Sequence, residues 1–272
     1  MMVRKPAVAG QFYPASEKSL RKKIEESFLH DLGPGKVPDE EGRLHNIKGI
    51  VVPHAGYEYS GPVAAHAYKA VYEDGKPDLF IIMGPNHRGV GASVSIAKED
   101  FKTPLGTAKV DEEVADQLVG GVIEYNDTAH MGEHSLEVQL PFIQYLWDDI
   151  EMVPLSFNIQ NYRTAKKVGD RIRNVIGEKN ALVVASTDFS HYVPKKIAEK
   201  KDKLAVDKII NNDPEGLFQI IQKENISMCG YGPVMAMMIG SRGSKGRLLK
   251  YATSGDIMAM REVVGYASLA FE

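Results

Sequence analysis

Apolar and polar residues follow two different patterns along this chain. Short runs that are apolar on both faces, such as 80–83 and 182–185, predict central strands covered by helices on each side. Longer segments place apolar residues every three or four positions, which predicts amphipathic helices. The predicted strands are 49–53, 79–83, 93–97, 152–155, 181–186, 248–253 and 263–270. The predicted helices are 17–29, 62–72, 111–118, 135–146, 162–176, 195–210, 214–223 and 232–239.

The alternation of strands and helices predicts an α/β fold with three layers around a central, mostly parallel mixed sheet. The 272 residues contain no linker rich in Pro, Gly or Ser and no internal repeat, so we expect a single domain over 1–272. No window reaches the roughly 20 apolar residues of a membrane span, and the start of the chain lacks the apolar core of a signal peptide. We therefore expect a soluble cytoplasmic protein that does not bind membranes.

Composition narrows the classes of partner. With 33 Lys and Arg against 36 Asp and Glu, the formal net charge is −3, which offers no general attraction to nucleic acid or to an anionic membrane. The expected partner is a small molecule or a protein. The single cysteine excludes an intrachain disulfide, a four-cysteine zinc site and a cysteine-ligated iron–sulfur cluster.

Three of the histidines stand at similar places in the predicted fold. His54, His87 and His191 each come shortly after a predicted strand, beside Gly, Pro, Ser or Asp rather than within an apolar face. One histidine at such a place is more often a loop residue bonded to backbone. Open α/β sheets bind ligands outside the carboxyl ends of their strands, so the three together predict a shared site. Imidazole can serve there as a ligand for Zn, Cu or Fe and as a proton carrier near neutral pH.

A fourth cluster places His130, Glu133 and His134 in the His-x-x-Glu-His order of the inverted zinc proteases. That motif needs both histidines on one face of a helix. Because Gly132 interrupts it and the apolar periodicity begins only afterwards, the cluster is expected to join a loop to a helix start. Glu133 and His134 are then orienting groups at the edge of a pocket. In the alternative interpretation, His134 or Ser135 simply caps the helix.

The only cysteine, Cys229, stands just before the predicted helix 232–239. A thiol near a helix N-terminus is biased toward the thiolate, which is the better nucleophile and metal ligand. The commonest fate of an intracellular cysteine is burial as a small apolar residue, and spacing alone favours burial here. A cysteine-protease pair with one of the histidines is a minor alternative.

Six ordered segments of the chain resemble the Memo family. They are 9–14 (AGQFYP), 53–61 (PHAGYEYSG), 84–87 (GPNH), 103–106 (TPLG), 133–142 (EHSLEVQLPF) and 186–192 (STDFSHY). Cys229 continues the match, so the resemblance extends over nearly the whole chain. Six motifs in the same order make a chance agreement very improbable.

The resemblance implies a fold similar to the class III extradiol ring-cleaving dioxygenases, with the site at the strand ends. In those enzymes two histidines and a glutamate hold Fe(II), and a further histidine acts as acid and base. Matched by motif, His54 and His87 take the positions of the two histidine ligands, and His191 takes that of the acid/base histidine. Cys229 stands where those enzymes have a carboxylate. The same is true of the animal Memo proteins, which are described as binding copper or iron and acting in redox signalling.

The cysteine changes the expected chemistry. Two histidines and a carboxylate suit Fe(II) with an open face, whereas a soft thiolate shifts the preference toward Cu(I) or Zn. The leading hypothesis is a redox-linked mononuclear site on His54, His87 and Cys229 that holds Fe(II) or Cu, with Zn as a further option. The chain would then be a metal-dependent oxidoreductase similar to a dioxygenase. His191 is the expected proton carrier, with His134 beside it, and Asp188 supplies an oxygen ligand or holds His191 in one tautomer.

Two other classes of function remain open in the sequence. Animal relatives are described as binding a phosphotyrosine peptide, so the pocket could be a peptide-binding or protein-binding module without turnover. Tyr13, Tyr57 and Tyr59 would then form its walls, and Arg88 is the one obvious cation for an anionic peptide. In the third hypothesis the chain is a zinc hydrolase that uses Glu133 as its base.

Overall fold

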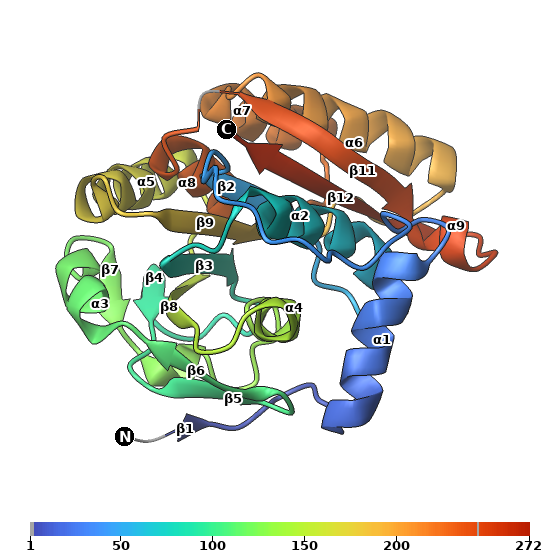
Figure 1. Cartoon of the computed structure of the whole chain (residues 1–272). Coiled ribbons are helices and arrows are strands. Elements are labelled where there is room, and N and C mark those ends of the chain that lie inside the picture. Colours follow the sequence, from blue (N-terminus) through green and yellow to red (C-terminus); the bar gives the residue numbers. More distant parts are fainter. Residues whose placement is uncertain (1–2, 244) are drawn as a thin grey trace.

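A mixed sheet crosses the molecule and carries helices on both of its faces (Figure 1). The computed structural model describes residues 3–243 and 245–272. The strands in this part of the chain are β1 (Val3–Arg4), β2 (Gly49–Val52), β3 (Leu79–Pro85), β4 (Val94–Ile96), β5 (Asp100–Thr103), β6 (Gly106–Val110), β7 (Ile123–Tyr125), β8 (Glu151–Phe157), β9 (Ala181–Ser186), β10 (His191–Val193), β11 (Gly246–Thr253) and β12 (Val263–Phe271). The helices are α1 (Glu17–Leu29), α2 (Gly61–Asp74), α3 (Glu112–Leu118), α4 (Leu140–Leu146), α5 (Tyr162–Ile176), α6 (Lys195–Ile210), α7 (Pro214–Glu224), α8 (Tyr231–Gly240) and α9 (Ser254–Ile257), with the 3-10 turns η1 (Asp127–Ala129) and η2 (Glu137–Gln139).

Parallel strands form the centre of the sheet, in the order β6-β8-β3-β9-β2. Antiparallel β12 follows β2 and pairs in turn with β11 and β10. Toward the other edge β5 pairs with β6 and β1 with β5, while β4 pairs with β8 and carries β7. The register places Val183 of β9 beside both Ile81 of β3 and Gly49 of β2. The predicted α/β architecture with a mostly parallel mixed sheet is confirmed.

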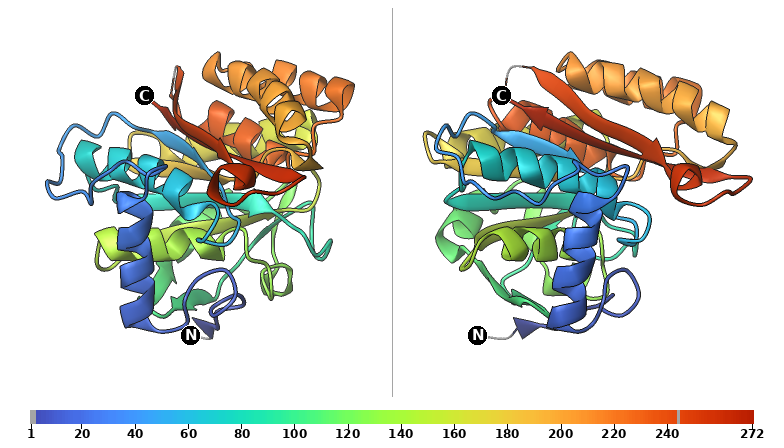
Figure 2. Two further views of the ribbon diagram at one scale, coloured as in Figure 1. Left: turned by 90° about the vertical axis from the view of Figure 1, so that its right-hand side faces the viewer. Right: turned by 45° about the vertical axis from the view of Figure 1, so that its right-hand side comes forward.

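The two faces of the sheet are covered by different helices. On one face α8 packs against β2, β3 and β9, and α5 packs on α8. On the opposite face α2 packs against β2 and β12 and contacts α1 and α4. In Figure 2 the orange helix α6 lies beside the red ribbon formed by β11 and β12, and α7 packs on α6 and α8. This cover explains why the central strands need apolar residues on both sides.

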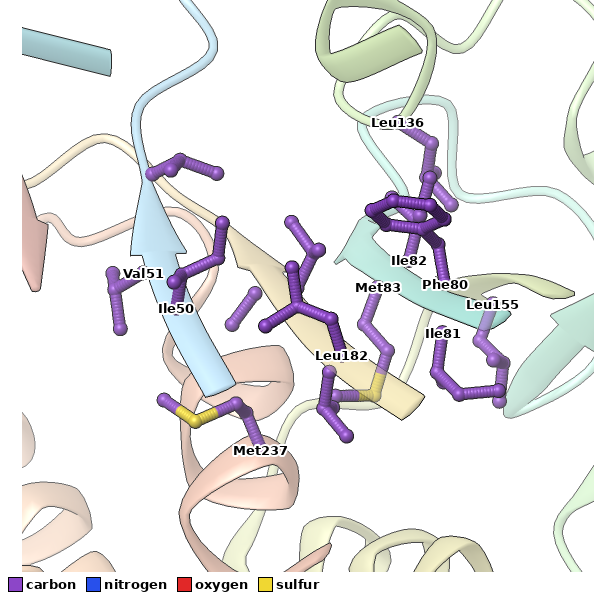
Figure 3. Close-up of a cluster of buried hydrophobic side chains, with 14 of the residues drawn as sticks. Ile50, Val51, Phe80, Ile81, Ile82, Met83, Leu136, Leu155, Leu182 and Met237 are labelled. Atoms are coloured by element: carbon purple, nitrogen blue, oxygen red, sulfur yellow. The ribbon is translucent and has the colours of Figure 1, made fainter. Parts of the chain in front are cut away.

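The core is built around the three central strands β2, β3 and β9. Every residue of β2, β3 and β9 is buried. Figure 3 shows Ile50 and Val51 pointing to opposite sides of β2, as successive residues of a strand do. Met237 of α8 lies close to β2 in the same view. The apolar residues of these three strands are thus all packed in the core. This packing holds the ends of the strands in fixed positions.

All seven predicted strands are present, and the helices predicted over 17–29, 162–176 and 195–210 have those bounds. Four other helices differ by one or two residues at an end. The prediction over 135–146 is wrong in its first half, because residues 137–139 form the 3-10 turn η2 and α4 begins only at Leu140, with a proline in its first turn.

Five strands, β1, β5, β6, β7 and β10, were not predicted. Each has five residues or fewer, which is too short for a clear alternation of apolar and polar positions. None of the helices in residues 3–243 and 245–272 combines the length and apolar character needed to cross a membrane.

Candidate metal centre

Three neighbouring strands end at the same edge of the sheet and deliver polar residues there. His87 follows β3 by two residues, Asp188 follows β9 by two, and His54 follows β2 by two. Since β9 lies between β3 and β2, the two histidines approach each other from either side of it. Their ring centroids are 5.3 Å apart, with the rings nearly perpendicular. Parallel strands thus bring together side chains that are far apart in the sequence.

Cys229 approaches the two histidines from the start of α8. Its Sγ lies 3.1 Å from Nε2 of His54. One ligand atom from each of His54, His87 and Cys229 lies within 4.8 Å of the others. The approach depends on Gly230, because a Cβ there would lie 2.4 Å from the carbonyl oxygen of Ser186. The only cysteine of the chain is therefore placed beside the histidines rather than lost in the apolar core.

The protonation of Cys229 differs from what its place before a helix predicts. Burial raises the pKa of the thiol, and the nearby Asp188 carboxylate raises it further. These effects outweigh the backbone N–H of Asp188, which donates to Sγ at 3.1 Å. The thiol of the metal-free chain therefore keeps its proton. A bound cation would reverse this balance, because a metal-coordinated thiol is deprotonated.

Glu133 holds His87 in one orientation. Its carboxylate accepts hydrogen bonds from the backbone N–H of His87 at 2.6 Å and from Nδ1 of the same residue at 2.9 Å. It also accepts from the backbone N–H groups of His134 and Ser135, both at 2.9 Å. Burial alone would raise the pKa of Glu133, but the hydrogen bond and charge of His87 and the N–H of Ser135 hold that pKa below its usual value. An ionised Glu133 fixes the proton on Nδ1 of His87 and leaves the Nε2 lone pair for a metal.

His54 is supported differently. It is 2% exposed, its backbone N–H donates to Asp188 at 2.8 Å, and its Nδ1 lies 2.9 Å from the hydroxyl of Ser186. Burial lowers the pKa of His54 well below 6.5, and the neighbouring His134 and His87 lower it further. The ring is therefore neutral near pH 7, which is the form that binds metals.

His191 lies at the cavity with its tautomer set by a backbone carbonyl. It begins β10, and its Nδ1 lies 2.8 Å from the carbonyl oxygen of Ser227. A carbonyl oxygen only accepts, so Nδ1 carries a proton, and in the neutral ring Nε2 is the acceptor. Ser227, and not Asp188, thus occupies the orienting position at His191. Asp188 instead binds the backbone of His54, and burial raises its pKa.

The two histidines of the His-x-x-Glu-His segment point to different places. The ring of His134 stacks on that of His87 with centroids 4.6 Å apart and lines the cavity. His130 is buried, with Nε2 3.0 Å from the carbonyl oxygen of Ser95 and its ring against Phe101. The arrangement of the inverted zinc proteases is therefore not formed. Neither His134 nor Ser135 caps a helix, since η2 has Leu136 at its N-cap.

A cavity of about 490 Å³ opens over these groups. It is lined by Phe12, His54, Ala55, Gly56, Tyr59, His87, His134, Asp188, His191, Tyr192, Ser254, Met260, Val264 and Tyr266. Among the described residues this lining contains aromatic and apolar side chains but no Lys or Arg. The cavity therefore combines apolar and aromatic walls with the polar atoms of four histidines and Asp188.

The expected tyrosine walls are corrected in part. Tyr59 lines the cavity, but Tyr13 and Tyr57 are buried and donate their hydroxyl protons to Glu137 and to the carbonyl of Val138, at 2.6 Å each. Arg88 is exposed and does not line the cavity. The other aromatic residues of the lining are Phe12, Tyr192 and Tyr266, which are adjacent only after the chain has folded.

Glu133 was predicted as an orienting group, whereas Ser186 and Ser227 were missed. A weak signal existed for both, since Ser186 is the last residue of a predicted strand and Ser227 precedes Cys229 by two residues. Serine at a strand end or in a turn is too common for that signal to identify a functional residue. Only the contacts with the two histidine rings show what these serines do.

Comparison with known proteins relates the chain to one family. A family model described as Memo-like protein matches residues 4–270. A MEMO1 family protein of Methanothermobacter thermautotrophicus is 47% identical over 99% of this chain and 100% of its own length. Another, from Methanopyrus kandleri, is 46% identical over 99% of both chains.

The fold has a counterpart among solved structures. The crystal structure of an uncharacterized protein from Escherichia coli K12 has a TM-score of 0.54 at 11% sequence identity, covering 82% of this chain and 99% of that chain. At that identity the likeness concerns the fold alone. The similarity to the two MEMO1 family proteins is much closer, because it is 46–47% identity over at least 99% of each aligned chain. This chain belongs to the Memo family.

Proposed function

We propose that the chain holds one transition-metal ion on Nε2 of His54, Nε2 of His87 and Sγ of Cys229, and that this site serves redox or oxygen-linked chemistry. The observation that carries the proposal is the meeting of these three ligand atoms within 4.8 Å of one another, with His54 and His87 lining a cavity. Two imidazoles and a thiolate form a mixed borderline and soft donor set, which fits copper, iron or zinc. The all-oxygen set preferred by Mg²⁺ or Ca²⁺ is absent from this cluster.

Each residue around the ligands has a distinct task in this proposal. A bound iron or copper ion would supply electron transfer and Lewis acidity. His191 presents an unprotonated Nε2 to the cavity and accepts a proton from a ligand there. Glu133 keeps the lone pair of His87 directed at the ion, and the stacked His134 limits the entry of water beside it. The chain would then act as a metal-dependent oxidoreductase on a small molecule.

The lining of the cavity favours a small molecule over a phosphotyrosine peptide. A phosphate group needs Arg or Lys within hydrogen-bond reach, and the described lining has neither. Aromatic walls and a volume of about 490 Å³ suit a compact, uncharged ligand. A zinc hydrolase with Glu133 as base gains no support, because that carboxylate is buried and already accepts four hydrogen bonds.

Metal analysis tests the proposal directly. Wild-type protein purified without added metal, and then reconstituted with Fe(II) or copper under anaerobic conditions, is expected to bind an equimolar amount of metal. Cys229→Ala and His54→Ala should each reduce the bound metal more than about tenfold, since each removes a direct ligand. His30→Ala removes an exposed imidazole outside the cavity and should match wild type. Equal trace metal in all four proteins, with failed reconstitution, would refute the metal site.

A further inference from the structure

A chain of buried hydrogen bonds lies directly beneath the candidate ligands, with the hydroxyl of Ser186 at its centre. Oγ of Ser186 lies 2.9 Å from Nδ1 of His54, 2.8 Å from Nε2 of Gln139 and 2.6 Å from the carbonyl oxygen of Ser135. All four residues are at most 2% exposed. Groups buried so deeply satisfy one another instead of water, so their donors and acceptors must match.

The orientation of Gln139 follows from its other two contacts. Nε2 of Gln139 lies 2.9 Å from the carbonyl oxygen of Pro53, and its Oε1 accepts the hydroxyl proton of Tyr68 at 2.8 Å. A carbonyl oxygen can only accept, so the NH₂ group must face Pro53. The second N–H of the same group is then donated to Oγ of Ser186. Gln139 is thus a donor to Ser186 and cannot be its acceptor.

The proton of Ser186 is also accounted for. The carbonyl oxygen of Ser135 only accepts, so it takes the single hydroxyl proton of Ser186. Oγ of Ser186 then has two lone pairs, and one of them accepts from Gln139. The other faces Nδ1 of His54, which must therefore carry a proton and donate it. Nε2 of His54 is left with its lone pair, directed at Sγ of Cys229 3.1 Å away.

We propose that Ser186 is a positioning residue that locks His54 in the Nδ1–H tautomer. Gln139 and Ser135 orient the Ser186 hydroxyl, and Tyr68 orients Gln139. The lock exists in the metal-free chain, and only its consequence for metal binding rests on the proposed function. None of these four residues contacts the ligand cavity, so they act through His54 and not on a substrate.

The same hydrogen-bond chain reaches the second histidine through Ser135. The backbone N–H of Ser135 donates to Glu133, which holds His87, and its Oγ donates to the carbonyl of Pro85 at 2.9 Å. Gly84 permits this contact, since a Cβ there would lie 2.5 Å from Oγ of Ser135. Ser186 therefore lies on a continuous path of hydrogen bonds that connects the supports of both histidines.

The tautomer is measurable without any metal. Long-range ¹H–¹⁵N correlation spectra of ¹⁵N-labelled, metal-free protein distinguish Nδ1–H from Nε2–H imidazole, and the signals missing from His54→Gln identify His54. The wild type is expected to show the Nδ1–H form. Ser186→Ala should move the ratio of the two tautomers about tenfold toward Nε2–H, which is the effect of losing one hydrogen bond between neutral groups.

Ser156→Ala is the matched control. Ser156 is a fully buried serine on β8 whose Oγ has no hydrogen-bond partner among the described residues. Removing it deletes a hydroxyl from the same sheet and should leave the His54 tautomer as in wild type. An Nε2–H form in the wild type, or a Ser186→Ala spectrum equal to wild type, would overturn the proposal. If Ser186→Ala does not fold, the wild-type spectrum alone decides it.

A zinc titration separates this proposal from the metal site itself. Ser186→Ala should weaken Zn²⁺ binding about tenfold to 100-fold, as loss of a residue that orients a ligand does. Ser156→Ala should bind Zn²⁺ like wild type. A wild-type chain that shows the Nδ1–H form but binds no metal would refute the proposed function and leave the tautomer lock standing. A shifted tautomer with unchanged Zn²⁺ affinity would overturn the positioning role.

Discussion

The two candidate histidine ligands, His54 and His87, differ in their exposure and in the group that binds Nδ1. His54 is 2% exposed and rests on the neutral hydroxyl of Ser186. The side chain of His87 is 36% exposed and rests on the ionised carboxylate of Glu133. A carboxylate behind an imidazole both orients it and increases its basicity, whereas a hydroxyl only orients it. One site thus contains an accessible imidazole supported by a charged carboxylate and an enclosed imidazole supported by a neutral hydroxyl.

The largest effect on metal affinity is expected from replacing Cys229, the proposed thiolate ligand. Cys229→Ser should weaken Cu(I) binding more than about 100-fold, because a direct ligand counts for more than the supporting residues do. Cys229→Asp should favour Fe(II) over Cu(I), since a hard carboxylate replaces a soft thiolate. Competition with a chromophoric Cu(I) chelator and an Fe(II) titration measure the two affinities. Cu(I) affinity in Cys229→Ser equal to wild type would show that the thiol is not a ligand.

Removing the carboxylate behind His87 should come next. Glu133→Gln keeps the shape of the side chain but removes its negative charge. The neutral amide cannot accept the four N–H groups as the ionised carboxylate does. We expect Zn²⁺ affinity to fall by up to about 100-fold. The free energy of unfolding of the metal-free protein should fall by about 2 kcal/mol. Urea unfolding and a Zn²⁺ titration give both values.

The exposed Glu58 offers the control for that experiment. Glu58→Gln removes a surface carboxylate paired with Lys23 and should change neither quantity measurably. If Glu133→Gln weakens Zn²⁺ binding no more than Ser186→Ala does, the two histidines are supported equally. The charge of Glu133 would then contribute no more to Zn²⁺ affinity than the neutral hydroxyl of Ser186.

Acid should act on the buried imidazoles before it acts on Glu133. The pKa of His54 is lowered from 6.5 in the folded chain, so the unfolded state binds more protons once the pH falls below about 6.5, and stability declines there. The pKa of Glu133 is also lowered, from 4.5, so its contribution is complete above pH 4.5 and is lost only below it. Between these two values the loss comes from buried imidazoles, since burial also lowers the pKa values of His130 and His134.

Urea unfolding of the metal-free protein from pH 7.5 to pH 4 measures this order. His54→Gln should make the decline between about pH 6.5 and 4.5 shallower, and Glu133→Gln should make it shallower only below about pH 4.5. A decline in wild type that begins only below pH 4.5 would contradict a buried, neutral His54.

The smallest effect is expected at the far end of the hydrogen-bond chain. Tyr68→Phe removes the hydroxyl that orients Gln139 and leaves Ser186 and His54 untouched. We expect a loss of about 1 kcal/mol in the free energy of unfolding and a change in Zn²⁺ affinity of less than about threefold. A larger effect on Zn²⁺ affinity than that of Ser186→Ala would mean that orientation is set by Gln139 rather than by the serine.

Much of the secondary structure was readable from the sequence, for reasons visible in particular segments. The run 182–185 is apolar on both faces because helices cover β9 on both sides. The segment 135–146 misled the prediction because its apolar spacing is helical while its first residues form turns. Ser135 and Glu137 in this segment, and Glu133 just before it, are buried polar groups whose hydrogen bonds go to distant parts of the chain.

The sequence by itself determined the seven predicted strands, the strand-end positions of His54 and His87, and the presence of one cysteine that could join them. Tertiary structure alone decided that β9 separates β2 from β3, that Cys229 reaches His54 across 175 residues of chain, and that Ser186 supports that ring. The physical reason is the range of the forces involved. Apolar periodicity is a local pattern imposed by burial, whereas a proton on a ring nitrogen is placed by every donor and acceptor around it, and these come from separate segments.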